Sequence, residues 1–195
     1  MKALLVVASI LLVASSRTRR VVPDSEGIQR PYVIAVKDGW DPVLGDKSYY
    51  FKMSPEPSDT QNRDAGVGFA FEVQTGPTDK LLWKTAGWFA WQVFLARDGR
   101  HMIRLGGWPR GDKPKAEDLA IAFYDAGVLV KSYSTLDLIK DAAAVPKSVS
   151  HYQFLGSGRT AFVDDGDAKD ALFRMSLADS TCVFRVSDGG LVSQR

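Results

Sequence analysis

Side chains that form disulfides or bind transition metals are scarce in this chain of 195 residues. The single cysteine, Cys182, cannot form an internal disulfide. The only histidines, His101 and His151, lie far apart in sequence, and with one cysteine they are too few for a usual zinc site. We therefore expect no metal and no cofactor. Cys182 alternates with apolar neighbours in "TCVFRV", which predicts a small buried side chain in a strand.

A charge excess of either sign is also missing. The 25 basic and 23 acidic side chains leave a formal net charge of +2. This balance excludes the strong positive field with which proteins attract nucleic acid, so no nucleic-acid partner is expected. Hydrophobic residues make up 45% of the chain and charged residues 25%, which is typical of a folded globular domain.

Long hydrophobic runs are absent outside the first twenty residues, "MKALLVVASILLVASSRTRR". Lys2, the apolar run 3–14 and the small residues of "VASS" have the layout of a secretory signal, and the run is shorter than the ~20 residues that span a membrane. The basic "RTRR" that follows favours, as an alternative, an uncleaved N-terminal anchor. We predict a signal peptide over 1–20 and a secreted or periplasmic protein. No stable membrane span is expected after cleavage.

Residues 21–195 are predicted to form a single β-rich domain. Short runs of aromatic and β-branched residues alternate, and Asp-Gly pairs between such runs indicate hairpins. The turns follow no fixed period, so no clean sequence repeat is indicated. We expect a mainly β fold of successive antiparallel hairpins, arranged as a sandwich or a partial propeller in preference to a closed barrel. The expected hairpins join 88–97 to 100–106, 118–124 to 128–133, and 172–178 to 181–187.

One short helix is predicted near 135–144. In "STLDLIKDAAAV", Ser134 can cap the free amides, and Asp137 is favourable in the first turn. Leu136 and Ile139 are expected to form the inner face, and Pro146 to end the helix.

The stretch "LARDGRHMIRLGGW" places a histidine among arginines and an acid. Alternation along the predicted strand puts His101 on the side of Ile103 and Leu105, and Arg104 on the opposite side. We interpret His101 as a half-buried, hydrogen-bonded side chain of a hairpin and not as a catalytic group.

His151, in the polar segment "KSVSHYQFLGSGR", is the better functional candidate. A Ser–His pair needs hydrogen-bond contact, and in a strand Ser150 and His151 would point to opposite faces. The segment also lacks the nucleophile-elbow pattern. We predict no catalytic residue, with His151 as the weak candidate.

Tryptophans supply the remaining candidates. Most aromatic residues of a β protein fill its core, but Trp88 alternates away from the apolar neighbours and Trp108 precedes a proline in an expected loop. The core remains the favoured place for the tryptophans as a group, with exposure of Trp88 and Trp108 as the alternative. We name Trp88, Trp108 and His151 as the candidate ligand-binding residues.

Several segments resemble those of small exported bacterial β-rich proteins of unknown function. These segments are "WQVFLARDGRHMIRLGGW", "DLAIAFYDAGVLVKSYSTLDLI", "SVSHYQF" and "FRMSLADSTCVFRVSDGGLVSQ", and the first is also similar to a strand pair of a propeller blade. The resemblance covers about residues 81–192 and implies export and a β fold with propeller-blade-like hairpins. It assigns no activity to any residue.

Three hypotheses on function follow. The first is an exported non-catalytic binding module for an envelope protein or a glycan, because no complete catalytic constellation is present. The second is a hydrolase-type enzyme that uses His151 with a distant carboxylate. The third is a structural or assembly role, which would require a long exposed strand edge.

Overall fold

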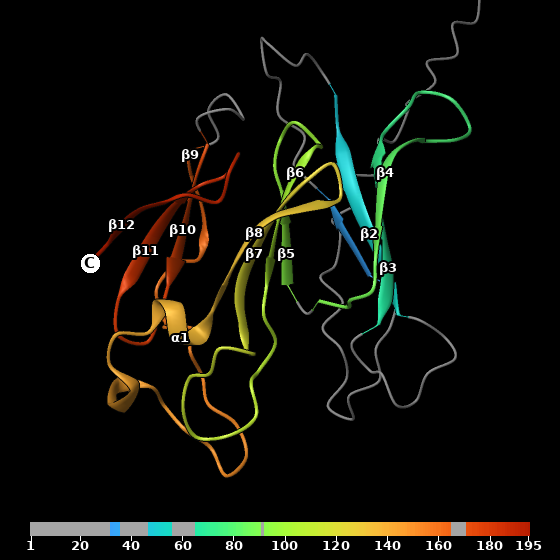
Figure 1. The fold of residues 1–195 in the computed structure, drawn as a ribbon. Coiled ribbons are helices and arrows are strands. Elements are labelled where there is room, and N and C mark those ends of the chain that lie inside the picture. Colours follow the sequence, from blue (N-terminus) through green and yellow to red (C-terminus); the bar gives the residue numbers. More distant parts are fainter. Residues whose placement is uncertain (1–31, 36–46, 56–64, 91, 165–170) are drawn as a thin grey trace, which may run out of the picture.

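The computed structural model describes residues 32–35, 47–55, 65–90, 92–164 and 171–195. The predicted signal peptide, residues 1–20, lies outside the described residues. Within them the chain is mainly β and forms three four-stranded antiparallel sheets, each built from consecutive strands (Figure 1). No sheet closes into a barrel within these ranges. The predicted fold class is therefore confirmed.

Each sheet is an up-and-down meander. Sheet 1 contains β1 (Tyr32–Ala35), β2 (Tyr49–Pro55), β3 (Gly66–Glu72) and β4 (Lys80–Ala86). Sheet 2 contains β5 (Gln92–Leu95), β6 (His101–Leu105), β7 (Leu119–Asp125) and β8 (Val128–Ser134). Sheet 3 contains β9 (Ala161–Asp164), β10 (Leu172–Ser176), β11 (Thr181–Arg185) and β12 (Leu191–Gln194).

The three predicted hairpins are present as the strand pairs β5–β6, β7–β8 and β10–β11. The β5–β6 turn uses the conformation that an Asp-Gly pair favours, since Gly99 has a φ of 66°. Gly99 is required for a second reason. A Cβ at this position would lie 2.4 Å from the Tyr49 ring. The Gly99 carbonyl also accepts a hydrogen bond from the Trp83 indole at 2.8 Å. The turn is therefore packed directly against sheet 1.

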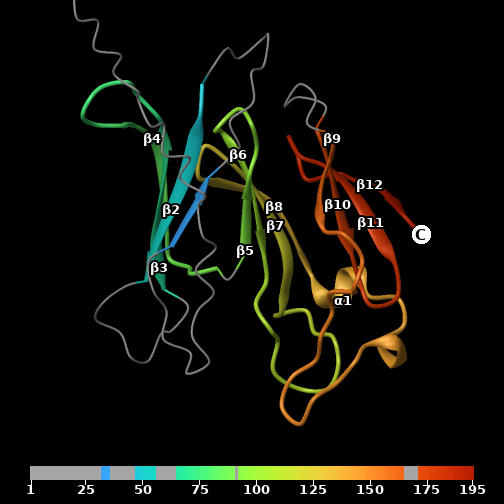
Figure 2. The same ribbon diagram turned by 180° about the vertical axis from the view of Figure 1, so that it is seen from behind.

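The sheets stack face to face, with sheet 2 in the middle (Figure 2). Along β6, Met102 faces sheet 1 and Ile103 faces sheet 3, and both are buried. One core cluster therefore lies on each side of sheet 2. The first, between sheets 1 and 2, includes Phe51, Trp83, Trp88, Val93 and Tyr124. The second, between sheets 2 and 3, includes Phe123, Tyr152, Phe173, Met175 and Phe184.

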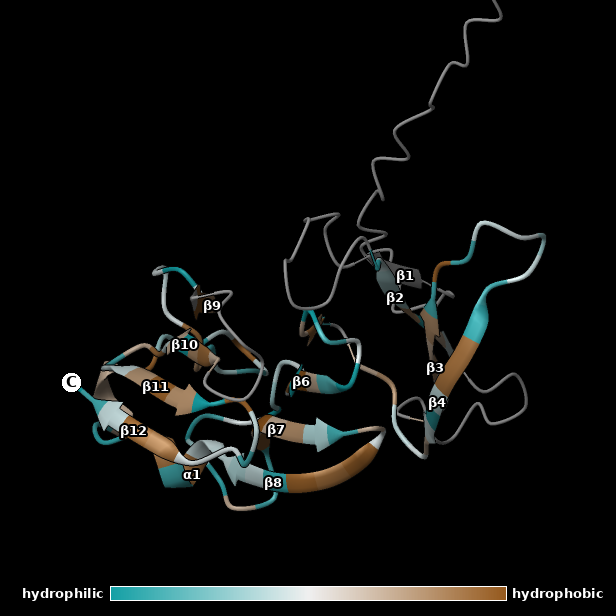
Figure 3. Ribbon diagram, turned by 90° about the horizontal axis from the view of Figure 1, so that it is seen from above, coloured by the Kyte–Doolittle hydropathy of each residue, from teal (hydrophilic) through white to brown (hydrophobic). Residues whose placement is uncertain are grey.

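This stacking of four-stranded meanders is the arrangement of neighbouring propeller blades. The first strands of sheets 1 and 2, β1 and β5, touch. The last strands β4, β8 and β12 lie along the outer margin of the molecule (Figure 3). The architecture repeats although the sequence shows no fixed period. Loops of different length, such as the one between β8 and β9 that contains the helix, hide the repeat from a periodicity analysis.

The predicted helix forms but is short. In α1 (Thr135–Leu138), Ser134 and Asp137 make a reciprocal capping box. The helix stops because the Asp179 carboxylate accepts the Lys140 amide at 2.6 Å and the Asp141 amide at 2.7 Å. A separate 3-10 turn, Ala142–Ala144, follows.

The prediction that Leu136 and Ile139 form the inner face of this helix was right for Ile139 and wrong for Leu136. Leu136 is 57% exposed, whereas Leu138 and Ile139 are buried. The early end of the helix leaves its last two apolar residues facing the core. No helix in the described part of the chain is long and apolar enough to cross a membrane.

Candidate functional site

Two loops meet at one end of the molecule, below α1 in Figures 1 and 2, and form a short two-stranded ribbon. Arg110 and His151 are antiparallel partners in it. The Gly111 amide donates to the Ser150 carbonyl at 2.9 Å, and the Tyr152 amide donates to the Pro109 carbonyl at 3.2 Å. We call these segments, residues 108–111 and 150–153, the Trp108 ribbon.

The ribbon has one buried and one solvent-facing side. Its two hydrogen bonds lie on either side of the Arg110–His151 pair, which makes this a non-hydrogen-bonded antiparallel pair. In such a pair the facing side chains are closest, so Arg110 and His151 lie next to each other on one face. Alternation places Trp108 and Gln153 on the same face. Trp108 is 76% exposed, Arg110 and Gln153 are exposed, and His151 is half-buried.

Tyr152 anchors the opposite face of the ribbon in the core, where it is 1% exposed. Its hydroxyl contacts the Thr135 hydroxyl at 2.6 Å and donates to the Asp118 carboxylate at 2.8 Å. Burial raises the pKa of Tyr152 to about 12, and the neighbouring Asp118 carboxylate adds to the shift. The phenol therefore stays neutral and holds the ribbon against α1 at any physiological pH.

A tight turn over residues 148–151 positions His151. The Ser148 amide donates to the His151 carbonyl at 2.8 Å, and the His151 amide donates to the Ser148 hydroxyl at 3.1 Å. Val149 lies at the tip of this turn and is fully exposed. The turn fixes the backbone on both sides of the histidine.

The expectation that Ser150 and His151 cannot meet was wrong. The Ser150 hydroxyl lies 2.7 Å from Nδ1 of His151. Strict alternation applies to a continuous strand, and here the two residues close a turn, so their side chains come together. Among the described residues, however, no carboxylate contacts the His151 ring, and the third group that orients the base in a catalytic triad is not found there.

Of the two placements considered for Trp88, exposure was wrong and the core was right. Trp88 is 7% exposed and belongs to the core between sheets 1 and 2. Its ring packs on Tyr124, with centroids 5.4 Å apart, and the Arg104 guanidinium carbon lies 4.5 Å from the ring centroid. Trp88 lies in the connection between β4 and β5 and not in a strand, so alternation does not apply to it, and the stacking of sheet 1 on sheet 2 covers its ring. Trp88 therefore lies away from the ribbon.

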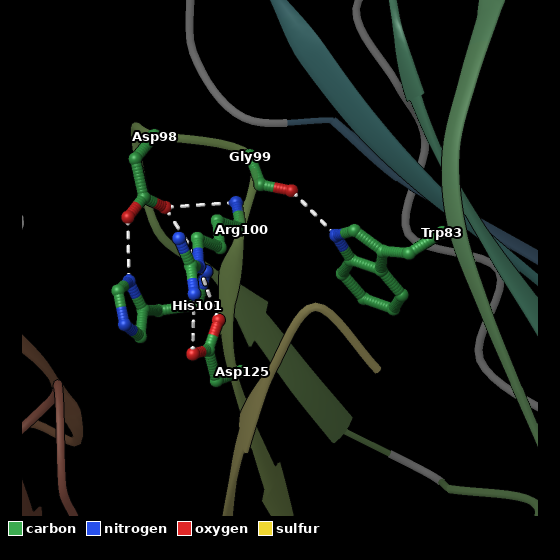
Figure 4. A network of polar contacts seen from close by, with 6 residues as sticks. All are labelled: Trp83, Asp98, Gly99, Arg100, His101 and Asp125. Atoms are coloured by element: carbon green, nitrogen blue, oxygen red, sulfur yellow. Dashed lines mark hydrogen bonds and ion pairs between the residues drawn. The ribbon is translucent and has the colours of Figure 1, made fainter. Parts of the chain in front are cut away.

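His101 is the half-buried, hydrogen-bonded residue that its sequence predicts (Figure 4). Its Nδ1 lies 2.5 Å from the Asp98 carboxylate, which also accepts the amides of Arg100 and His101. The hydrogen bond to Asp98 raises the pKa of His101 despite its partial burial. Burial opposes ionisation of Asp98, but these hydrogen bonds outweigh it and lower the pKa of Asp98. Arg100 in turn pairs with Asp125. The network closes the β5–β6 turn.

Cys182 is fully buried, as predicted, and burial raises its thiol pKa to about 11. Such a thiol is a poor nucleophile at neutral pH. Across the described ranges, no group of three or more His, Cys, Asp or Glu side chains could hold a metal ion.

The structure thus brings together Trp108 and His151, two of the three predicted ligand residues, and separates Trp88 from them. It also adds Arg110 and Gln153, which sequence analysis missed. Within each of the segments "WPR" and "HYQ", exposed and buried residues alternate. Only the pairing of Arg110 with His151 shows that the exposed residues of the two segments share a face. Comparisons with known protein families, curated proteins and solved structures found no match.

Proposed function

We propose that this chain is an exported, non-catalytic binding domain and that the Trp108 ribbon binds a glycan. The observation that carries the proposal is the shared face of the ribbon. It presents a 76% exposed tryptophan beside an arginine, a histidine and a glutamine. A large aromatic ring left in solvent, next to hydrogen-bonding groups, is typical of a binding surface and not of a core.

The chemistry of these four side chains suits a sugar. A pyranose has apolar C–H faces that pack on an aromatic ring, and hydroxyls around its rim that need donors and acceptors. Trp108 supplies the ring, and Arg110, His151 and Gln153 supply the polar groups. Because the turn over residues 148–151 and the Tyr152 anchor hold the ribbon in place, little ordering free energy is lost on binding.

A test starts from purified residues 21–195, titrated with cell-wall oligosaccharides in a calorimeter and in thermal unfolding. A ligand that binds only the folded state raises the melting temperature in a saturable way. We expect Trp108→Ala to abolish this rise. Val128→Ala is the matched control, since Val128 is 69% exposed on β8, and it should leave the rise unchanged. Equal binding by the wild type and Trp108→Ala would refute the ribbon as the site.

If no saccharide binds, a protein ligand becomes the favoured alternative, and a feature outside the ribbon offers a place for it. The outermost strand of sheet 2, β8, is exposed along Val128, Leu129 and Val130, and among the described strands it pairs with β7 alone (Figure 3). An unpaired apolar edge can add a strand from another chain. The oligomeric state is therefore measured alongside, because concentration-dependent association without saccharide binding would favour the assembly role.

The Ser150–His151 contact favours a second candidate function, a hydrolase in which Ser150 attacks and His151 accepts its proton. The distant carboxylate that this candidate needs does not contact His151 within the described residues. The test is hydrolysis of an activated acetyl ester by the wild type, Ser150→Ala and Ser148→Ala. Activity that only Ser150→Ala removes would support the hydrolase, and no difference among the three would dismiss it.

A further inference from the structure

We infer that the glycan bound by the Trp108 ribbon carries a carboxylate, so that its ligand class is an acidic saccharide. This inference rests on the proposed function and deepens it. It depends on Arg110, which is the one charged residue of the ribbon's solvent-facing side.

The charge of Arg110 is available to a ligand. Two other arginines of turns and strands, Arg100 and Arg185, are neutralised in ion pairs with Asp125 and Asp188. Arg110 is exposed, and no described residue forms an ion pair with it. Its guanidinium therefore keeps all five donors for a ligand, in the planar fork that matches a carboxylate.

His151 extends this donor set. The hydroxyl of Ser150 lies against Nδ1, and when the hydroxyl donates, the neutral ring carries its proton on Nε2. No other hydrogen bond to the His151 ring exists among the described residues, so Nε2–H remains for a ligand. Arg110 and His151 are directly opposite in a non-hydrogen-bonded antiparallel pair. The guanidinium and the imidazole therefore project from neighbouring positions on the same face.

No acidic side chain stands on this face within the ribbon. Asp112 follows shortly after Arg110, but Gly111 between them has a φ of 110°, which ends the extended run and breaks the alternation. Lys147 is the antiparallel partner of Tyr152 and so belongs to the opposite face of the ribbon. The charge of Arg110 is therefore not balanced by an acid on its own face, although the whole chain is nearly neutral.

These groups fit one binding mode. A uronic acid residue places its ring on Trp108 and its carboxylate against Arg110 and His151, and a neighbouring hydroxyl reaches Gln153. A neutral sugar of the same shape would make the same stacking contact but would leave the guanidinium without a counter-ion. The structure thus assigns selectivity to Arg110 and affinity to Trp108.

The experiment compares trigalacturonic acid with neutral galactotriose by calorimetry on residues 21–195. We expect the acid to bind more tightly by about tenfold, which corresponds to one charged hydrogen-bonded contact. Arg110→Gln should remove the difference between the two sugars and leave the weak neutral binding in place. Arg174→Gln is the matched control, because Arg174 is exposed on β10 in sheet 3, and it should retain the selectivity.

Each outcome separates the inference from the proposed function. Equal affinity for both trisaccharides, unchanged in Arg110→Gln, would overturn the acidic-saccharide inference and leave a neutral-glycan module standing. Binding of neither trisaccharide, together with no response to the cell-wall oligosaccharides, would overturn both. Selectivity that Arg110→Gln and Arg174→Gln reduce equally would also overturn the inference, because it would show general charge attraction and no defined site.

Discussion

The ion pair between His101 and Asp98 makes the stability of this protein depend on pH in a defined way. Asp98→Asn isolates the charge, because the remaining oxygen can still accept the amides of Arg100 and His101, which both reach the same carboxylate oxygen. What is lost is the charged contact between Asp98 and the His101 ring at 2.5 Å.

The size of this loss follows from the burial of the pair. Each side chain is 14% exposed. A fully exposed pair is worth 0.2–1 kcal/mol, and removing one partner of a fully buried pair costs about 3–5 kcal/mol. This pair lies between those limits, so we expect Asp98→Asn to lower the free energy of unfolding by about 2 kcal/mol at pH 5.5.

The loss should be greatest between the two unfolded-state pKa values of about 3.9 for Asp and 6.5 for His. The pKa of His101 is raised on folding, so its contribution is complete below its unfolded value and disappears as the pH rises through the folded value. The pKa of Asp98 is lowered on folding, so its contribution is complete above its unfolded value and disappears as the pH falls through the folded value. The difference between wild type and variant should therefore peak near pH 5–6 and shrink on both sides.

Urea unfolding followed by tryptophan fluorescence at pH 3, 5.5 and 9 measures this difference. Asp112→Asn, at an exposed site without an ion-pair partner among the described residues, is the control and should change stability little. A proton NMR titration in the His151→Gln background reports His101 alone, and Asp98→Asn should lower its pKa. A pH-independent difference, or an unchanged His101 titration, would refute the argument.

Three other predictions concern packing. Gly106→Ala should lower the free energy of unfolding by more than about 3 kcal/mol in urea, because the new Cβ would lie 1.6 Å from the Leu119 carbonyl oxygen. Gly76→Ala is the control and should be nearly neutral, since a Cβ at Gly76 would have no atom within 4 Å. Equal stability of the two variants would contradict the tight strand contact. Phe173→Ala should cost about 4 kcal/mol in the same assay, since the ring is fully buried between sheets 2 and 3, and a loss below 1 kcal/mol would argue against that core. Cys182 should react with a disulfide reagent only after unfolding, and rapid labelling of the folded protein would contradict its burial and its pKa of about 11.

Local features of this fold could be predicted because neighbours in sequence decide them. The backbone preferences of Asp98 and Gly99 themselves favour the tight turn that they form, in which Gly99 has a φ of 66°. The capping box of Ser134 and Asp137 is equally local. His101 was placed correctly for the same reason, because its partner Asp98 is three residues away in the same hairpin. The sequence by itself therefore determined the β class, the hairpins and the helix start.

Only the tertiary structure decided the candidate site. Trp88 was misplaced because it lies in the connection between β4 and β5 and not in a strand, so alternation does not apply to it, and the packing of sheet 1 on sheet 2 buries it. Trp108 and His151 share a face because a two-residue bridge joins loops that are far apart in sequence, and Arg110 and Gln153 gained their positions through the same register. Register between distant segments depends on long-range packing, here the Tyr152 anchor beneath α1, and no local preference encodes it.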